Sequence, residues 1–178
     1  MKLRLKNSLS TKQIAAIAVF IALNIVFVRF LAINPTPITR IGLGNIPIIL
    51  SGMVLGPFAG LIVGGISDFI GAIFFSGTGF YYPPLTLAPM LLGAITGLAW
   101  NKFVSNKKVY NIIILICAAE LITEFGWKTL CLSWLQKIPY WSALGERAPF
   151  LFLIIVVDVT VICFLLKQNI TKLIRREI

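Results

Sequence analysis

The chain has 178 residues, of which 58% are hydrophobic and only 12% are charged. A soluble domain is about one half apolar and about one quarter charged, so this composition excludes an ordinary water-soluble domain. The sequence has no histidine, which excludes a histidine base, a Ser-His triad and a histidine metal site. The net charge of +10 could indicate a nucleic-acid binder, but the basic residues are distributed as in a membrane protein, and we expect no nucleic-acid partner.

Six apolar segments follow one another along the chain. They predict an all-α fold, an integral membrane bundle of six transmembrane helices in a single domain over residues 1–178, since a spanning helix needs about 20 apolar residues. The predicted helices cover about 11–31, 45–55, 57–75, 85–100, 110–132 and 148–166. The first segment could instead be a signal peptide, but its apolar run continues to Ala32 and further apolar segments follow. Strands are not expected, because these runs lack the alternation of a barrel.

The turn between the second and third segments is Gly56-Pro57, which suits the end of one helix and the start of the next. Basic residues gather near the start of the chain, in one central loop and near its end: Lys2, Arg4, Lys6, Lys12, Lys102, Lys107, Lys108, Lys167, Lys172, Arg175 and Arg176. This positive-inside pattern predicts that both termini are cytoplasmic and that the chain is a multi-pass protein of the plasma membrane. The loops at 33–44, 76–84 and 133–147 are then outside.

Small residues recur at a spacing of four, as in Gly60/Gly64, Gly93/Gly97 and Ala18/Ala22. Residues four apart share a helix face, and small ones let two backbones approach closely. We expect the glycine pairs to pack inside the bundle. The alanine pair is more open to an external contact, because it lies on the first helix.

Four of the six acidic residues lie within predicted membrane segments: Asp68, Glu120, Glu124 and Asp158. A charge at membrane depth costs roughly 2.5–3.5 kcal/mol, so it usually faces a cavity or a partner. Asp68 follows the small-residue face and should point into the bundle, where it could contact a ligand. Glu124 and Lys128 are four apart and could contact a ligand or form a structural ion pair. Asp158 and Glu120 lie deeper toward the cytoplasm and are weaker candidates.

The predicted outer side carries cations and aromatic rings. The cations are Arg40, Lys137 and Arg147, with Arg29 and Lys128 near helix ends; the rings are Phe80, Tyr81, Tyr82, Trp127, Trp134, Tyr140 and Trp141. Snorkelling and an aromatic belt in contact with membrane lipid explain some of them. A flat, anionic small molecule would also use them, because rings stack and arginine holds carboxylates with two hydrogen bonds.

Three stretches resemble a known family. They are RIGLGNIPIILSG at 40–52, LGPFAGLIVGGISD at 55–68 and YPPLTLAPMLLG at 82–93. They resemble the S components of energy-coupling factor (ECF) transporters, most closely the folate-specific branch. The resemblance covers essentially the whole chain in length and helix count.

The resemblance implies a vitamin site that opens outward, tipping of the protein in the membrane during transport, and partnership with a transmembrane T component and two ATPase subunits. It also implies that Ala18 and Ala22 contact the T component. For folate, an acid such as Asp68 or Glu124 could accept hydrogen bonds from the pterin. Rings such as Phe80, Tyr82 and Trp127 could stack on it, and Arg40, Lys128 or Arg147 could hold the carboxylates.

Other readings remain open. The protein could be an S component for riboflavin, pantothenate or thiamine, although riboflavin has no carboxylate for the outer cations. It could also be a membrane assembly subunit. An enzyme is disfavoured, because the chain has neither a P-loop nor a nucleophile–base pair. We expect no cofactor and no metal, and the three cysteines show no CxxC spacing.

Overall fold

A computed structural model gives the fold and describes residues 10–36, 39–75, 81–103 and 109–168. Its helices are α1 (Thr11–Arg29), α2 (Asn45–Leu55), α3 (Pro57–Phe75), α4 (Pro83–Phe103), α5 (Val109–Glu120), the π-helical η1 (Leu121–Lys128), α6 (Thr129–Gln136) and α7 (Tyr140–Lys167). Because α5, η1 and α6 run on as one rod, Val109–Gln136, the part of the chain that is described contains six helical rods. Five of them are long and apolar enough to cross a membrane, and α2 is the short one. The expected bundle of six helices is confirmed.

The helix boundaries follow local chemistry. Ser10 and Gln13 form a reciprocal capping box at the start of α1. Gly56 ends α2 with a φ of 101°, which side chains other than glycine rarely adopt, and Pro57 opens α3. The predicted stop and start at 56–57 therefore lie where the sequence placed them.

The outer segments differ from the prediction. The loop expected over 133–147 is largely helical, because α6 continues to Gln136 and α7 begins at Tyr140 instead of at about residue 148. The Pro139 carbonyl starts α7 by accepting the backbone N–H groups of Ser142 and Ala143. The fall in hydropathy near Arg147 marks the edge of the apolar segment and not the end of the helix.

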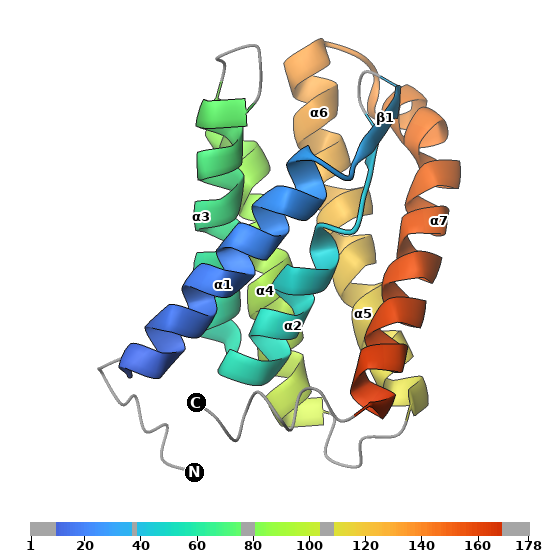
Figure 1. Ribbon diagram of the computed structural model, residues 1–178. Helices are drawn as coiled ribbons and strands as arrows, with labels where there is room; N and C mark the ends of the chain where they lie inside the picture. Colours follow the sequence, from blue (N-terminus) through green and yellow to red (C-terminus); the bar gives the residue numbers. More distant parts are fainter. Residues whose placement is uncertain (1–9, 37–38, 76–80, 104–108, 169–178) are drawn as a thin grey trace.

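A short hairpin was also not expected. Strands β1 (Ile33–Thr36) and β2 (Thr39–Ile41) pair antiparallel within the predicted loop 33–44, with Ile33 opposite Ile41. The hairpin lies at the same end of the bundle as α6 and the start of α7 (Figure 1).

The backbones of α3 and α4 come into direct contact at glycines. A side-chain carbon on Gly60 would lie 2.5 Å from the Gly93 carbonyl oxygen, and one on Gly93 would overlap the Gly60 carbonyl. Gly64 meets the Pro89 carbonyl and Gly97 meets Pro57 in the same way. The short helix α2 is buried along most of its length and packs on both α3 and α4. The predicted internal packing of the glycine pairs is confirmed.

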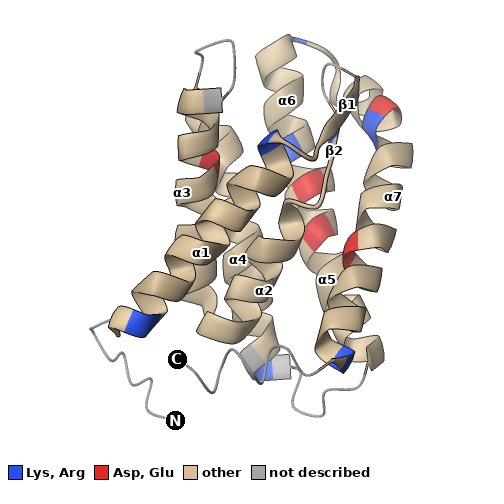
Figure 2. Cartoon of the chain, viewed as in Figure 1, with Lys and Arg blue, Asp and Glu red and all other residues tan. Residues whose placement is uncertain are grey.

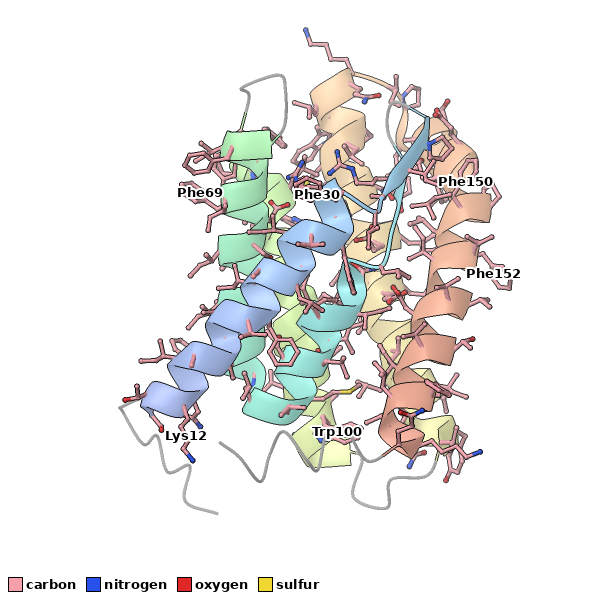
Figure 3. The ribbon with its side chains drawn as sticks, in the orientation of Figure 1. Lys12, Phe30, Phe69, Trp100, Phe150 and Phe152 are labelled. Atoms are coloured by element: carbon pink, nitrogen blue, oxygen red, sulfur yellow. The ribbon has the colours of Figure 1, made fainter. Side chains whose placement is uncertain are left out.

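The two ends of the bundle and its outward-facing surface carry different residues. The helix α1 begins and α7 ends at the same end (Figure 1), and Lys12 and Trp100 lie there, whereas Phe30 lies toward the other end (Figure 3). Phe69 and Phe152 point outward and are 46% and 68% exposed, as expected of side chains that face lipid. The acids on α3, η1, α5 and α7 lie along the helices between these ends (Figure 2).

Candidate functional site

The long rod changes its winding where the predicted site residues lie. Eight residues, Leu121–Lys128, adopt a π-helix between α5 and α6. A π-helix has a wider turn and often occurs at functional sites, because it leaves backbone carbonyls open to other donors. The Glu124 carbonyl accepts the backbone N–H of Thr129 and is also open to two side chains. It accepts a 2.8 Å hydrogen bond from the Thr129 hydroxyl and a 3.3 Å bond from Nη1 of Arg147.

The Glu124 side chain is the centre of an ion-pair network. Its Oε1 lies 2.7 Å from Nζ of Lys128, and its Oε2 lies 3.2 Å from Nη2 of Arg147. Arg147 also donates through Nη1 to the Thr129 hydroxyl oxygen. Glu124 and Arg147 are buried and Lys128 is half-buried. The predicted Glu124–Lys128 pair is thus formed, and the structure adds Arg147 from α7 as its second cation.

A second network surrounds Asp68 on α3. The Thr86 hydroxyl, on α4, donates to Oδ2 of Asp68 at 2.8 Å. Because a threonine hydroxyl has one hydrogen, the 3.0 Å contact between Thr86 and the Tyr81 hydroxyl is one in which Tyr81 donates. Tyr81 also packs edge-on against Phe69. Asp68 is half-buried and faces the bundle, as its position on the small-residue face predicts.

Arg29 joins this second network, although the sequence predicts it only as a cation near a helix end. Its guanidinium lies against Gly71, where an added side-chain carbon would be 2.7 Å from Nε and from Nη2. Arg29 is close enough to Asp68 and to Arg40, on β2, to interact electrostatically with both. A usable signal was present, since Gly71 lies three residues after Asp68 and so leaves room beside it for a long side chain.

The two networks meet at the first turn of α4. The indole N–H of Trp127, on η1, donates to the Pro84 carbonyl at 2.8 Å, and Thr86, two residues further on, holds Asp68. The buried Cys131 thiol lies 3.7 Å from the same carbonyl. Trp127 therefore fixes η1 to α4 and so links the Glu124 network to the Asp68 network.

The remaining predicted residues fall in different places. Tyr82 is half-buried directly before α4, and Phe80 lies outside the described residues. Trp134 and Trp141 are 67% and 78% exposed, so they match an aromatic belt better than an internal site. Ala18 and Ala22 are exposed on α1. Among the residues that the structure describes, no group of three or more acids or cysteines could hold a metal ion.

Comparison with known proteins places this arrangement among transporter subunits. The family model for the ECF-type riboflavin transporter S component matches residues 8–168. The protein named Folate transporter FolT from Clostridium novyi (strain NT) is 42% identical over 120 residues, which cover 67% of this chain and 65% of that relative's length.

Solved structures agree with this placement. The crystal structure of FolT bound with folic acid matches with a TM-score of 0.78 at 28% identity, covering 88% of this chain and 93% of that chain. An S component for biotin from an ECF-type ABC transporter shares the fold, with a TM-score of 0.68 at 20% identity over 90% and 96% of the two chains. By the family match over most of its length, the chain belongs to the S components of ECF-type transporters, which are multi-pass proteins of the plasma membrane.

Proposed function

We propose that this chain binds folate from outside the cell and delivers it to an energy-coupling module. The observation that carries the proposal is the placement of Asp68 together with Arg29 and Arg40 at one end of the bundle. An acidic acceptor beside two cations suits a ligand that has both hydrogen-bond donors and carboxylates. The relatives named for folate select this vitamin among the possible ligands.

Each end of folate has a chemically suitable partner in this region. The donor-rich edge of the pterin can give hydrogen bonds to the Asp68 carboxylate, and the carboxylates of the glutamate tail can pair with arginine. Tyr82 is close enough in sequence to Tyr81 and Thr86 to add a ring to the same region. Glu124, Lys128 and Arg147 already form ion pairs with one another. We therefore assign them mainly to holding η1 and α7 together, and only secondarily to contact with the ligand.

Riboflavin is the competing ligand, because the matching family model is described by that vitamin. Riboflavin has no carboxylate, so it brings no anionic group to Arg29 and Arg40. Arg29 is half-buried and Arg40 is exposed, and the carboxylates of folate give both an additional anionic partner. Folate therefore fits the outer charges better.

The orientation and the partners belong to the same proposal. We place both termini in the cytoplasm, because Lys12, Lys102 and Lys167 all lie in the first or last turns of helices at the end where α1 begins and α7 ends (Figure 1). The chain itself would not hydrolyse ATP. It would associate with a membrane T component through the exposed face of α1 at Ala18 and Ala22, and two ATPase subunits would supply the energy.

Ligand titration tests this proposal directly. The detergent-purified chain is titrated with folate and, separately, with riboflavin, and tryptophan fluorescence is recorded. We expect saturable quenching by folate alone. Tight binding of riboflavin instead would overturn the folate assignment, and no response to either vitamin in folded protein would overturn both.

Variants then locate the site. Arg40→Gln and Asp68→Asn should each weaken folate binding at least tenfold. The matched control is Lys137→Asn, which removes an exposed cation and retains a residue that tolerates the left-handed backbone there. Equal affinities for the control and for Arg40→Gln would show that overall charge, and not this cluster, attracts the ligand.

A further inference from the structure

Two acids outside the proposed folate site meet in the interior of the bundle. Glu120 is the last residue of α5, and Asp158 lies in the middle of α7. Both side chains are 0% exposed. Their carboxyl groups are close enough to interact with each other, and their helices α5 and α7 pack together, so the pair lies between the long rod and α7 well inside the apolar segment.

The four carboxylate oxygens of this pair lack a donor. Within the described part of the chain, no group meets hydrogen-bond geometry at any of them. The Asn45 side chain, at the start of α2, is close enough to interact with Asp158 but does not complete a hydrogen bond. Buried polar atoms without partners are uncommon and costly, so an ionised pair would need a hydrogen-bond donor that the described side chains do not supply.

The surrounding elements supply no cation. Glu124 on η1 and Cys117 on α5 also interact with Glu120, and both are neutral or acidic. The helix α2 has no charged residue, and the only charged residue of α4 is Lys102, in its last turn. On α7, Arg147 is engaged with Glu124, and Lys167 lies at the far end of the helix. If both carboxyl groups were ionised, they would therefore repel each other, with no cation beside them to offset the repulsion.

A single proton resolves this contact. Two carboxyl groups in contact do not both ionise, because a shared proton converts their repulsion into an O–H···O⁻ hydrogen bond. With one proton the pair has a charge of −1. The neighbouring network of Glu124, Lys128 and Arg147 has one carboxylate and two cations, hence a charge of +1. The two groups together are then neutral, as a membrane interior favours.

We propose that Glu120 and Asp158 form a proton-binding site that holds α5 against α7 within the membrane. The proton is bound by the carboxylate of one residue and donated to the other. At alkaline pH the proton leaves, both carboxylates are charged, and the contact between the two helices weakens. Neither residue belongs to the Asp68 network.

Thermal unfolding across a range of pH tests the site with the full chain in detergent. Wild type should lose stability as the pH rises from neutral to alkaline. Glu120→Gln and Asp158→Asn should lose that pH dependence, because an amide N–H replaces the shared proton and donates to the remaining carboxylate. Glu146→Gln, which changes an exposed acid on α7, should keep the wild-type profile. Identical pH profiles for wild type and Glu120→Gln would overturn the proposal.

Infrared spectroscopy of the wild type tests for the bound proton even if the amide variants do not fold. At neutral pH we expect the carbonyl-stretch band of a protonated carboxyl group, lost on alkaline titration and, in variants that fold, lost in Glu120→Gln. Absence of this band in folded wild type would overturn the proposal. Stabilisation by Na⁺ over K⁺ at equal ionic strength, absent in Glu120→Gln, would overturn it in favour of a bound metal cation.

Discussion

On one side of the bundle α2, α3 and α4 meet through glycines, and on the other α5, η1 and α7 meet through ionisable side chains. The first contact brings backbone against backbone, as Gly60 and Gly93 show. The second contains Glu124, Arg147 and the Glu120–Asp158 pair, all buried. The contact through glycines requires residues without a side chain, because a larger residue would clash with the opposing backbone. The contact among α5, η1 and α7 requires that the buried acidic and basic groups compensate one another's charge.

This difference has a consequence for transport. Close-packed glycines permit little rearrangement, because any added volume forces the helices apart. A charge network can be rearranged by a ligand or a proton that changes its balance. Movements that accompany ligand binding are therefore expected in α5, η1 and α7 more than in α2, α3 and α4.

The largest effect is expected from Glu124→Leu, which leaves Arg147 buried without its carboxylate. Breaking one partner of a buried ion pair costs about 3–5 kcal/mol. Thermal unfolding in detergent should show a large loss. Adding Arg147→Met to this variant should recover much of it, because both charges are then gone. Glu146→Leu, the same substitution at an exposed acid, should change little, and no recovery in the double variant would contradict the pairing.

On the glycine side, Gly93→Ala should destabilise the protein by about 1–3 kcal/mol, because its new methyl group overlaps the Gly60 carbonyl. Gly145→Ala is the control, since a methyl group there meets nothing within 4 Å. It should be neutral or slightly stabilising, because alanine favours a helix. Equal melting temperatures for the two variants would show that α3 and α4 are less closely packed than described.

The link between the two sides is tested by Trp127→Phe. This change removes the N–H that donates to the Pro84 carbonyl and keeps an aromatic ring. Hydrogen bonds between membrane helices contribute about 0.6 kcal/mol on average, so a small loss of stability is expected. Trp134→Phe, at a tryptophan that is 67% exposed, should have no effect. If Trp127 joins the networks, its variant should also weaken folate binding.

The smallest effect is expected from Lys128→Gln. The Lys128 side chain is 36% exposed, and partly solvated ion pairs contribute less than about 1 kcal/mol. Glu124 keeps Arg147 in this variant. The difference in melting temperature from wild type should shrink as salt is added, because salt screens exposed charges. A loss as large as that of Glu124→Leu would mean that Lys128 and not Arg147 is the principal partner.

Spacing along single helices was enough to predict part of the site. The recurrence of small residues every four positions predicts the packed faces at Gly60 and Gly93. Asp68 lies on the same helix as Gly60, and its spacing from that glycine predicts that it faces the bundle. The Glu124–Lys128 pair followed from their separation of four. Both kinds of feature can be predicted from one helix alone: the two members of the ion pair are on the same helix, and a packed face is defined by the spacing of residues along one helix.

Contacts between distant segments were not accessible in this way. Arg147 was expected in an outer loop, but α7 begins at Tyr140, so Arg147 is buried against Glu124 and Thr129. Arg29 was noted only as an outer cation, and its place against Gly71 depends on how α1 crosses α3. The π-helical winding of Leu121–Lys128 also left no mark in the hydropathy.

The sequence by itself determined the membrane class, the number of helices, the turn at Gly56-Pro57 and the glycine faces, because these depend on hydropathy and on spacing within one segment. Only the tertiary structure decided which charges are paired. It gave Glu124 two cations and left Glu120 and Asp158 facing each other with none. The physical reason is that the free energy of a buried charge depends on its neighbours in space, and these come from helices that are far apart along the chain.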